Sequence, residues 1–220
     1  MATVVITGAN RGLGFAFAKC FSARGDRVIG TARKPQSDSP LASVAAQVIA
    51  LDVSFDDSVE RFAAQVAEPV DLLINNAGIL VPEDFQTATA QSILNQVNVN
   101  GLGAFRVTRA LLSRLREAEA ARVVNITSRM GSIGDNTSGR MYGYRMSKAA
   151  LNMATVSMSH DLAPISVVAV HPGMVQTAMV GNHGELSADQ AVERMVPIID
   201  RLDRAMSGQF LHRDGYEIPW

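Results

Sequence analysis

Tyr144 and Lys148 are the residues of this chain whose types and spacing most directly suggest chemistry. They stand four positions apart in Tyr144-Arg145-Met146-Ser147-Lys148, inside a stretch predicted to be helical. Residues at this spacing are neighbours on one helix face. A free tyrosine has a pKa of about 10, and a positive charge beside it favours the phenolate and moves that pKa toward neutral pH. The pair predicts an acid–base tyrosine, although the same spacing also occurs on solvated helix faces.

A glycine-rich turn joins the first predicted strand to the first predicted helix, in the run Thr7-Gly8-Ala9-Asn10-Arg11-Gly12-Leu13-Gly14. Glycines let the backbone approach a pyrophosphate, and a helix N-terminus offers it N–H groups and a favourable dipole. The alternative is a turn without a ligand, but the strand–turn–helix context favours a dinucleotide site. The expected contacts are Gly8, Asn10, Arg11, Gly12, Leu13 and Gly14.

The end of the second predicted strand indicates which dinucleotide binds. A NAD site usually has an acidic residue there, which binds the ribose hydroxyls. Here the strand ends in Ala32-Arg33, and no Asp or Glu occurs between residues 28 and 37. Arg33 alone could be a surface arginine, but Arg33 and Arg11 together suit a 2′-phosphate through charge-assisted hydrogen bonds. The sequence therefore predicts NADP(H) rather than NAD.

Two further polar segments follow predicted strands. Asp52-Val53 follows the third strand, where the carboxylate could accept a hydrogen bond from the adenine amino group or cap the next turn. Asn75-Asn76-Ala77-Gly78 closes the fourth strand. We expect the main role of this segment to be structural, with its amides bridging strands. Contact of Asn76, Ala77 and Gly78 with the cofactor is expected as a secondary role.

The pattern of elements predicts an α/β fold. Short Val/Ile/Leu-rich strands alternate with helices, which implies a parallel sheet buried on both faces. Right-handed crossovers then give a doubly wound sheet, a Rossmann fold. We expect about seven strands, flanked by helices, in a single domain over residues 1–220. The strands are predicted at 4–6, 27–31, 47–51, 71–74, 122–127, 165–170 and 208–211, and the helices at 15–24, 56–66, 90–119, 142–162 and 187–202.

The composition excludes several classes of function. The chain has 220 residues, a formal net charge of −1 and no basic block, which argues against a nucleic-acid or anionic-membrane partner. No apolar run reaches the ~18 residues that a membrane span needs. The single cysteine, Cys20, excludes an internal disulfide, and we expect a cytoplasmic protein. The four histidines lack metal-ligand spacing, so no metal is expected.

Over nearly its whole length the chain resembles the short-chain dehydrogenase/reductase family. The residues that carry the resemblance are, in order, Thr7–Gly14, Asp52, Asn75–Gly78, Asn100, Ser128, Tyr144 with Lys148, and Pro172-Gly173. The segments Tyr144–Asn152, His171–Thr177 and Asp214–Trp220 also resemble a narrower group, the C-factor and sniffer-like carbonyl reductases.

The resemblance implies a role for each matching residue at the chemical centre. Tyr144 would protonate the carbonyl oxygen as hydride arrives, and Lys148 would lower its pKa and hold the nicotinamide ribose. Ser128 would donate a hydrogen bond to the substrate oxygen. Asn100 would hold a water that links Lys148 to solvent. At the turn after the sixth strand, Pro172, Gly173, Val175 and Thr177 would bind the nicotinamide carboxamide.

Each of these assignments has a local rival. Tyr142 is close to Tyr144 but has Met146, not a cation, four positions on. Thr127 adjoins Ser128, and alternation along a strand turns only one of them into the site. Asn98 rivals Asn100, and the spacing to the following glycine favours Asn100.

The implied activity is NADPH-dependent reduction of aldehydes or ketones, reversible as alcohol oxidation, on a small carbonyl or alcohol substrate. Family members commonly pair their long helices, so a homodimer or homotetramer is expected. The alternative is a cofactor-binding signalling or regulatory protein in which turnover is incidental. A serine hydrolase is disfavoured because no Gly-x-Ser-x-Gly elbow is present.

Overall fold

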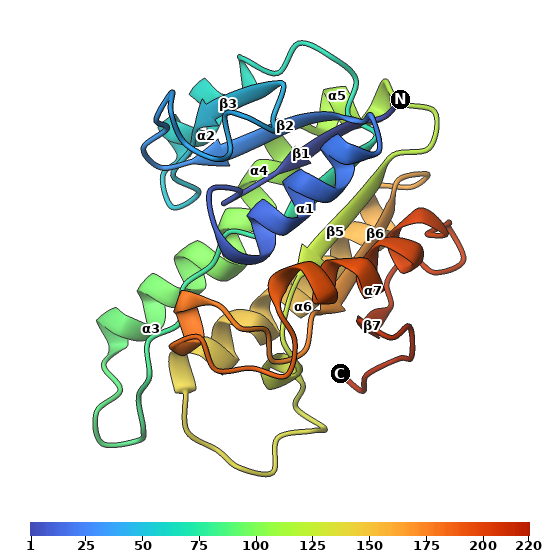
Figure 1. Cartoon of the computed structure of the whole chain (residues 1–220). Coiled ribbons are helices and arrows are strands. Elements are labelled where there is room, and N and C mark those ends of the chain that lie inside the picture. Colours follow the sequence, from blue (N-terminus) through green and yellow to red (C-terminus); the bar gives the residue numbers. More distant parts are fainter.

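A computed structural model describes all 220 residues, and its centre is one sheet of seven parallel strands (Figure 1). The spatial order is β3-β2-β1-β4-β5-β6-β7, which confirms the predicted doubly wound sheet. The strands are β1 (Thr3–Ile6), β2 (Arg27–Ala32), β3 (Gln47–Ala50), β4 (Leu72–Asn75), β5 (Arg122–Ile126), β6 (Ser166–His171) and β7 (Phe210–His212).

Helices cover both faces of the sheet, which explains why the strands are apolar on both sides. They are α1 (Gly12–Ala23), α2 (Asp56–Ala63), α3 (Ala90–Val97), α4 (Gly103–Ala110), α5 (Leu112–Arg116), α6 (Tyr142–Asp161) and α7 (Ala188–Asp200). Phe17 of α1 and Val192 of α7 belong to the same buried cluster as Val4 of β1. The next residue of β1, Val5, belongs to the opposite cluster with Phe62 of α2.

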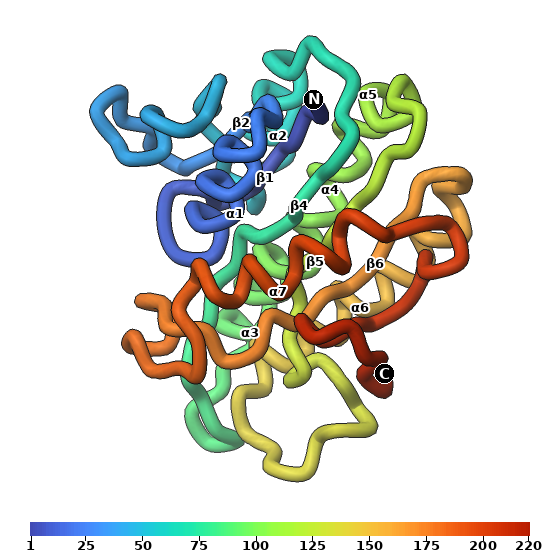
Figure 2. The backbone as a smooth tube through the Cα atoms, turned by 45° about the vertical axis from the view of Figure 1, so that its right-hand side comes forward, coloured from blue at the N-terminus to red at the C-terminus, as the bar shows by residue number.

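The strand order reverses beside β1, which pairs with β2 on one side and with β4 on the other. Ligands of open α/β sheets bind at such a switch point, outside the carboxyl ends of the strands. The segments that follow β1, β4, β5 and β6 leave from this one edge. In Figure 2 the loop between β5 and α6, in yellow, and the segment between β6 and α7, in orange, both lie at this end of the molecule.

Three predicted helices differ from the observed ones by three or more residues, and one of them, predicted over 56–66, ends at Ala63. The first helix begins at Gly12 rather than at residue 15, with Arg11 as its N-cap. The helix predicted over 90–119 is divided into α3, a π-helical turn over Asn98–Leu102, α4 and α5, and it ends at Arg116. A β-carbon on Gly103 would lie 2.8 Å from a methyl group of Val53, so glycine permits the close approach here. No helix of the protein is long and apolar enough to span a membrane.

Candidate active site

Tyr144 and Lys148 lie on one face of the first turns of α6, as their spacing predicts. Both side chains are buried, with 8% and 5% of their surface exposed. The ammonium of Lys148 lies 5.8 Å from the centroid of the Tyr144 ring. It donates a hydrogen bond of 2.8 Å to the backbone carbonyl of Ile126, at the end of β5. The cation is therefore held between α6 and the sheet.

Burial controls the protonation of both groups. Desolvation raises the pKa of Tyr144 to about 12, against the smaller lowering effect of a hydrogen bond with the Ser128 hydroxyl. Desolvation also lowers the pKa of Lys148 to about 8. The expectation that Lys148 brings the phenol pKa toward neutrality is wrong for this arrangement, because burial of the phenol dominates its pKa and Lys148 is not among the groups that shift it.

The structure separates Ser128 from its neighbour Thr127. The Thr127 hydroxyl donates to the side-chain oxygen of Asn152 at 2.7 Å, inside the interface between β5 and α6. Ser128 instead accepts from the backbone N–H of Met130 at 3.1 Å, and its side chain acts on the Tyr144 phenol by lowering the phenol pKa. Only Ser128 faces the reacting side of the tyrosine. The rival Tyr142 is exposed, and its ring lies against Phe85 with centroids 5.8 Å apart.

Asn100 lies in the π-helical turn, a feature often found at functional sites. Its side-chain nitrogen donates to the carbonyl of Ile79 and to the hydroxyl of Ser147, both at 2.8 Å. Its side-chain oxygen accepts from the N–H of Ile79 at 2.8 Å. Asn100 thus ties the loop after β4 to α6, and its side chain is fully occupied. The rival Asn98 instead donates to the carbonyl of Ser54 at 3.2 Å.

The glycine-rich turn forms a cradle that side chains would fill. Gly8 has a φ of +64°, and a β-carbon on it would lie 3.1 Å from the Cα of Ala77. Gly12 has a φ of +54°, and its β-carbon would lie 3.3 Å from a methyl group of Thr177. A β-carbon on Gly14 would overlap the carbonyl of Gly8. The turn after β1 therefore meets the end of β4 and the segment after β6, with Leu13 buried beneath it.

The end of β4 is fastened to the glycine turn by hydrogen bonds. The Thr7 hydroxyl accepts from the backbone N–H groups of Asn76 and Ala77 at 2.9 and 3.0 Å. Asn75 donates to Asn125 of β5 at 2.9 Å, which confirms the expected bridge between strands. Gly78 lies against Asn100, whose side-chain oxygen would be 3.2 Å from a β-carbon there. The backbone after β4 is thus held in place beside the glycine turn.

Positive charge is concentrated at the end of β2. Arg11 and Arg33 are exposed, and neither takes part in any ion pair of the structure. A cavity of about 250 Å³ opens there, lined in part by Asn10, Ala32 and Lys34. Lys34 is a residue that sequence reasoning missed, and its signal was its place directly after Arg33.

Asp52 follows β3 and caps the turn ahead of α2. One of its carboxylate oxygens accepts from the N–H of Ser54 at 3.0 Å and from the Ser54 hydroxyl at 2.5 Å. The capping role that the sequence allowed is therefore present, and the second oxygen is left for another donor. A cavity of about 490 Å³ adjoins it, lined by Asp52, Phe55, Asp56, Asp57, Ser58 and Arg61, and the buried Val53 follows it in the chain.

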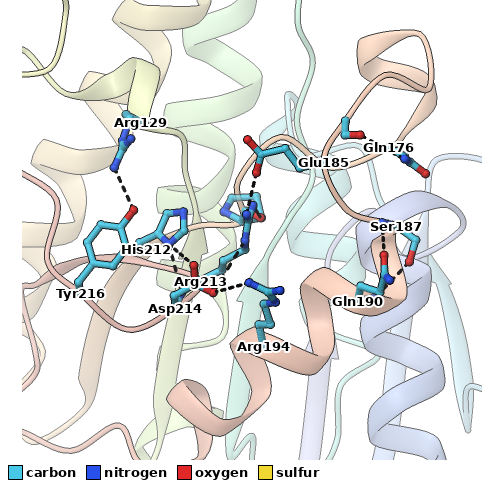
Figure 3. Close-up of polar contacts among 12 residues, drawn as sticks. Arg129, Gln176, Glu185, Ser187, Gln190, Arg194, His212, Arg213, Asp214 and Tyr216 are labelled. Atoms are coloured by element: carbon cyan, nitrogen blue, oxygen red, sulfur yellow. Dashed lines mark hydrogen bonds and ion pairs between the residues drawn. The ribbon is translucent and has the colours of Figure 1, made fainter.

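The segment from Pro172 to Glu185, here called the β6 strap, is held at both ends by Arg213 (Figure 3). The buried guanidinium donates to the carbonyl of Pro172 at 3.1 Å and to the carboxylate of Glu185 at 2.8 Å. It lies directly over Gly173, where a side chain would overlap it. Val175, within the strap, is buried and forms a β-bridge with Leu186. No sequence motif indicated Arg213.

Behind the strap lies a pair of histidines that the sequence also did not single out. The rings of His171 and His212 have centroids 5.5 Å apart. His212 also stacks on Tyr216, with centroids 4.4 Å apart (Figure 3). Burial, followed by the charges of His212, Arg129, Arg213 and Lys148, lowers the pKa of His171 to about 3. His171 is therefore neutral at physiological pH.

Comparison with known proteins agrees with this geometry. Residues 2–187 match the sequence profile of a family described as short chain dehydrogenase. The chain is 35% identical to 1-hydroxy-2-glutathionyl-2-methyl-3-butene dehydrogenase of Rhodococcus sp. strain AD45, over 100% of both chains. It is 46% identical to C-signal of Myxococcus xanthus, over 74% of this chain and 100% of that protein.

Solved structures give the same result. NADPH-bound carbonyl reductase from chicken fatty liver superimposes with a TM-score of 0.92 at 29% identity, covering 100% of this chain and 94% of that one. Carbonyl reductase Sniffer of D. melanogaster gives a TM-score of 0.89 at 27% identity, covering 100% of both. The chain, which bears the glycine cradle and the Ser128–Tyr144–Lys148 constellation, belongs to the short-chain dehydrogenase family and is a nicotinamide-dependent oxidoreductase.

Proposed function

We propose that this protein reduces the carbonyl group of small aldehydes or ketones with NADPH, and catalyses the reverse alcohol oxidation. The observation that carries the proposal is the buried Tyr144 phenol, whose pKa Ser128 influences and which lies one helical turn from Lys148. This group lies at the same edge of the sheet as the glycine cradle.

The residues present fit a dinucleotide with a 2′-phosphate. Gly8, Gly12 and Gly14 leave backbone room for a pyrophosphate, and the N-terminus of α1 favours its charge. Arg11, Arg33 and Lys34 supply positive charge for the extra phosphate. When bound, the reduced cofactor supplies the hydride that the carbonyl carbon accepts. The structural neighbour from chicken liver, an NADPH-bound carbonyl reductase, supports this choice over NADH.

The protein's own residues would handle the proton. A pKa of about 12 keeps Tyr144 protonated at neutral pH, so the phenol is ready to give its proton to the carbonyl oxygen. The Ser128 hydroxyl donates to the same oxygen and stabilises the negative charge that develops there. The Lys148 ammonium stabilises the phenolate that remains. A water on the backbone carbonyl of Asn100 would return the proton, because the side chain of Asn100 is occupied.

The loops around the site favour an apolar carbonyl substrate. Met174 and Met179 on the β6 strap have 58% and 43% of their surface exposed. Phe85, after β4, is 81% exposed. Methionine adapts to varied shapes, so an open, permissive site is expected.

The test is NADPH consumption with a panel of aldehydes and ketones, comparing the wild type with Tyr144→Phe. Removal of the proton donor is expected to lower kcat by ~100-fold or more, since general acid catalysis contributes about 10²–10⁴. NADPH binding, measured by cofactor fluorescence, should remain within a few fold. Equal turnover by the two proteins would overturn the proposal.

A second candidate is a cofactor-loaded signalling protein, and the 46% identity to C-signal of Myxococcus xanthus favours it. The same panel separates the two. Tight NADPH binding by the wild type with no turnover of any carbonyl would support the signalling role.

A further inference from the structure

Glu83 carries a buried carboxylate that the mechanism above does not use. It lies in the loop between β4 and α3, and only 7% of its surface is exposed. Burying a carboxylate is costly unless hydrogen bonds satisfy it. The hydrogen-bond partners of the Glu83 carboxylate therefore indicate which part of the structure it stabilises.

The carboxylate of Glu83 caps the N-terminus of α6, the helix that carries Tyr144 and Lys148. One oxygen accepts a short hydrogen bond from the backbone N–H of Gly143, the residue directly before Tyr144. The helix has no side-chain cap of its own at Met141 and no acidic residue in its first turn. Glu83, distant in sequence, thus supplies both the acceptor and the negative charge that a helix N-terminus favours.

The backbone of Glu83 holds the residues that lead into the same helix. Arg140 and Met141 both adopt the left-handed conformation, with φ values of 58° and 55°. Side chains disfavour this conformation, so the surrounding structure must impose it. The N–H of Met141 donates to the carbonyl of Glu83 at 2.7 Å. One residue therefore fixes both the approach to α6 and its first turn.

Side chains of α3 hold Glu83 itself in place. The hydroxyl of Ser92 donates to its second carboxylate oxygen at 2.7 Å, and the amide of Gln96 donates to the first at 3.4 Å. Helices α3 and α6 lie side by side (Figure 1). A β-carbon on Gly143 would lie 2.6 Å from the carboxylate, so the glycine leaves room for this contact. The carboxylate is clamped from α3 and aimed at α6.

We propose that Glu83 is a positioning residue for Tyr144: by capping and anchoring the first turn of α6, it sets where the phenol stands relative to Ser128. The expected effect on kcat rests on the proposed carbonyl reduction, whereas the anchoring of α6 by Glu83 does not. A misplacement of about 1 Å at the reacting group can cost ~100-fold in rate. Glu83 makes no hydrogen bond to a residue of the glycine cradle.

The first test is steady-state kinetics of Glu83→Ala, Glu83→Asp and Glu83→Gln. Glu83→Ala should lower kcat for carbonyl reduction by ~10–100-fold while KM for NADPH stays within about twofold. Glu83→Gln keeps an oxygen for the Gly143 N–H and should restore kcat to within about threefold of wild type. Glu83→Asp moves the carboxylate away from the Gly143 N–H, so its kcat should lie between those of Glu83→Ala and Glu83→Gln. This variant replaces Glu83→Ala in the test if Glu83→Ala does not fold.

The second test is hydrogen exchange of the backbone amides at 141–148, which needs no turnover. Exchange there should be about tenfold faster in Glu83→Ala or Glu83→Asp, with α1 and the glycine turn unchanged. The control is Asp84→Asn, because that half-buried carboxylate accepts hydrogen bonds only within its own loop, from Gln86 and Thr87. It should leave both readouts near wild type.

Several outcomes overturn the proposal. They are a kcat that Glu83→Ala leaves unchanged, a parallel loss of kcat and NADPH affinity, and unaltered exchange at 141–148 in Glu83→Ala and Glu83→Asp. If the wild type turns over no carbonyl, the proposed function fails, while the exchange result still decides whether Glu83 anchors the helix.

Discussion

Lys148 is the residue at the site whose titration lies nearest neutral pH, because burial lowers its pKa to about 8. A lowered pKa means that the amine loses its proton as pH rises through this value. Catalysis that needs the cation is then lost on the alkaline side. We expect kcat/KM for NADPH, which reports the free enzyme, to be level below pH 8 and to fall about tenfold per pH unit above it.

The measurement is the pH profile of NADPH oxidation with a fixed carbonyl. The phenol of Tyr144, with a pKa of about 12, should contribute no break in the accessible range. Lys148→Met should be slow at every pH and show no alkaline fall. A wild-type break close to 10 would mean that burial does not control Lys148.

Arg33 supports a second prediction at the residue scale. Arg33→Asp removes a cation from the end of β2 and places there the acid that NAD sites usually have. One lost charge-assisted hydrogen bond is worth about 1.5–3 kcal/mol, so the Kd for NADPH should rise ~10–100-fold while NADH binds equally well or better.

Titration of each cofactor against heat unfolding measures this preference. Arg116→Asp is the matched control, because Arg116 is exposed on α5, at the opposite edge of the sheet, and the charge change is the same. An unchanged preference in Arg33→Asp would contradict the assignment of the 2′-phosphate site.

At the scale of elements, the β6 strap depends on one buried side chain. Arg213 has 8% of its side-chain surface exposed, whereas its partner Glu185 has 67%. Arg213→Ala would leave the carbonyl of Pro172 without its donor and loosen both ends of the strap. We expect the free energy of unfolding to fall by ~2–4 kcal/mol and the KM for NADPH to rise, since Thr177 lies within the strap.

Glu185→Gln is the matched comparison for that variant. It keeps the shape of the side chain and removes only the charge of a carboxylate that is 67% exposed, so it should cost less than ~1 kcal/mol in urea unfolding. Equal costs for the two variants would show that the ion pair between Arg213 and Glu185, and not the contact with Pro172, holds the strap.

The elements also show what the sequence could and could not predict. The glycine turn and the Tyr144–Lys148 pair are local, because neighbours in the chain meet through helix and turn geometry alone. The contacts of Glu83 with Gly143, and of Arg213 with Pro172, join distant segments and follow no periodic pattern. The sequence predicts a lowered pKa for Tyr144, whereas the pKa is raised. The spacing of residues in the chain does not show how deeply packing buries the phenol.

At the scale of the whole molecule, the parallel sheet brings the ends of β1, β4, β5 and β6 to one edge. Ionisable groups consequently lie close together there. His171 ends β6, beside the His212 ring of β7, and is also within the influence of Arg129, Arg213 and Lys148. Each of these neighbours is cationic or can become so. A proton on His171 is therefore opposed by burial and by its surroundings together.

Acid should consequently weaken the fold through His171. Its pKa is lowered to about 3 in the folded protein, against an ordinary value of 6.5, so between these values only the unfolded chain takes up the proton. Stability is then lost as pH falls from 6.5 toward 3, by up to ~1.4 kcal/mol per pH unit for one such group.

Urea unfolding at pH values of about 7.5, 6.0 and 5.0, on either side of the ordinary histidine pKa, measures this slope. His171→Asn should flatten it, whereas His160→Asn, at an exposed position of α6, should leave it unchanged. Parallel slopes in wild type and His171→Asn would mean that other groups govern the acid response, because the substitution removes the only proton whose uptake distinguishes the two proteins.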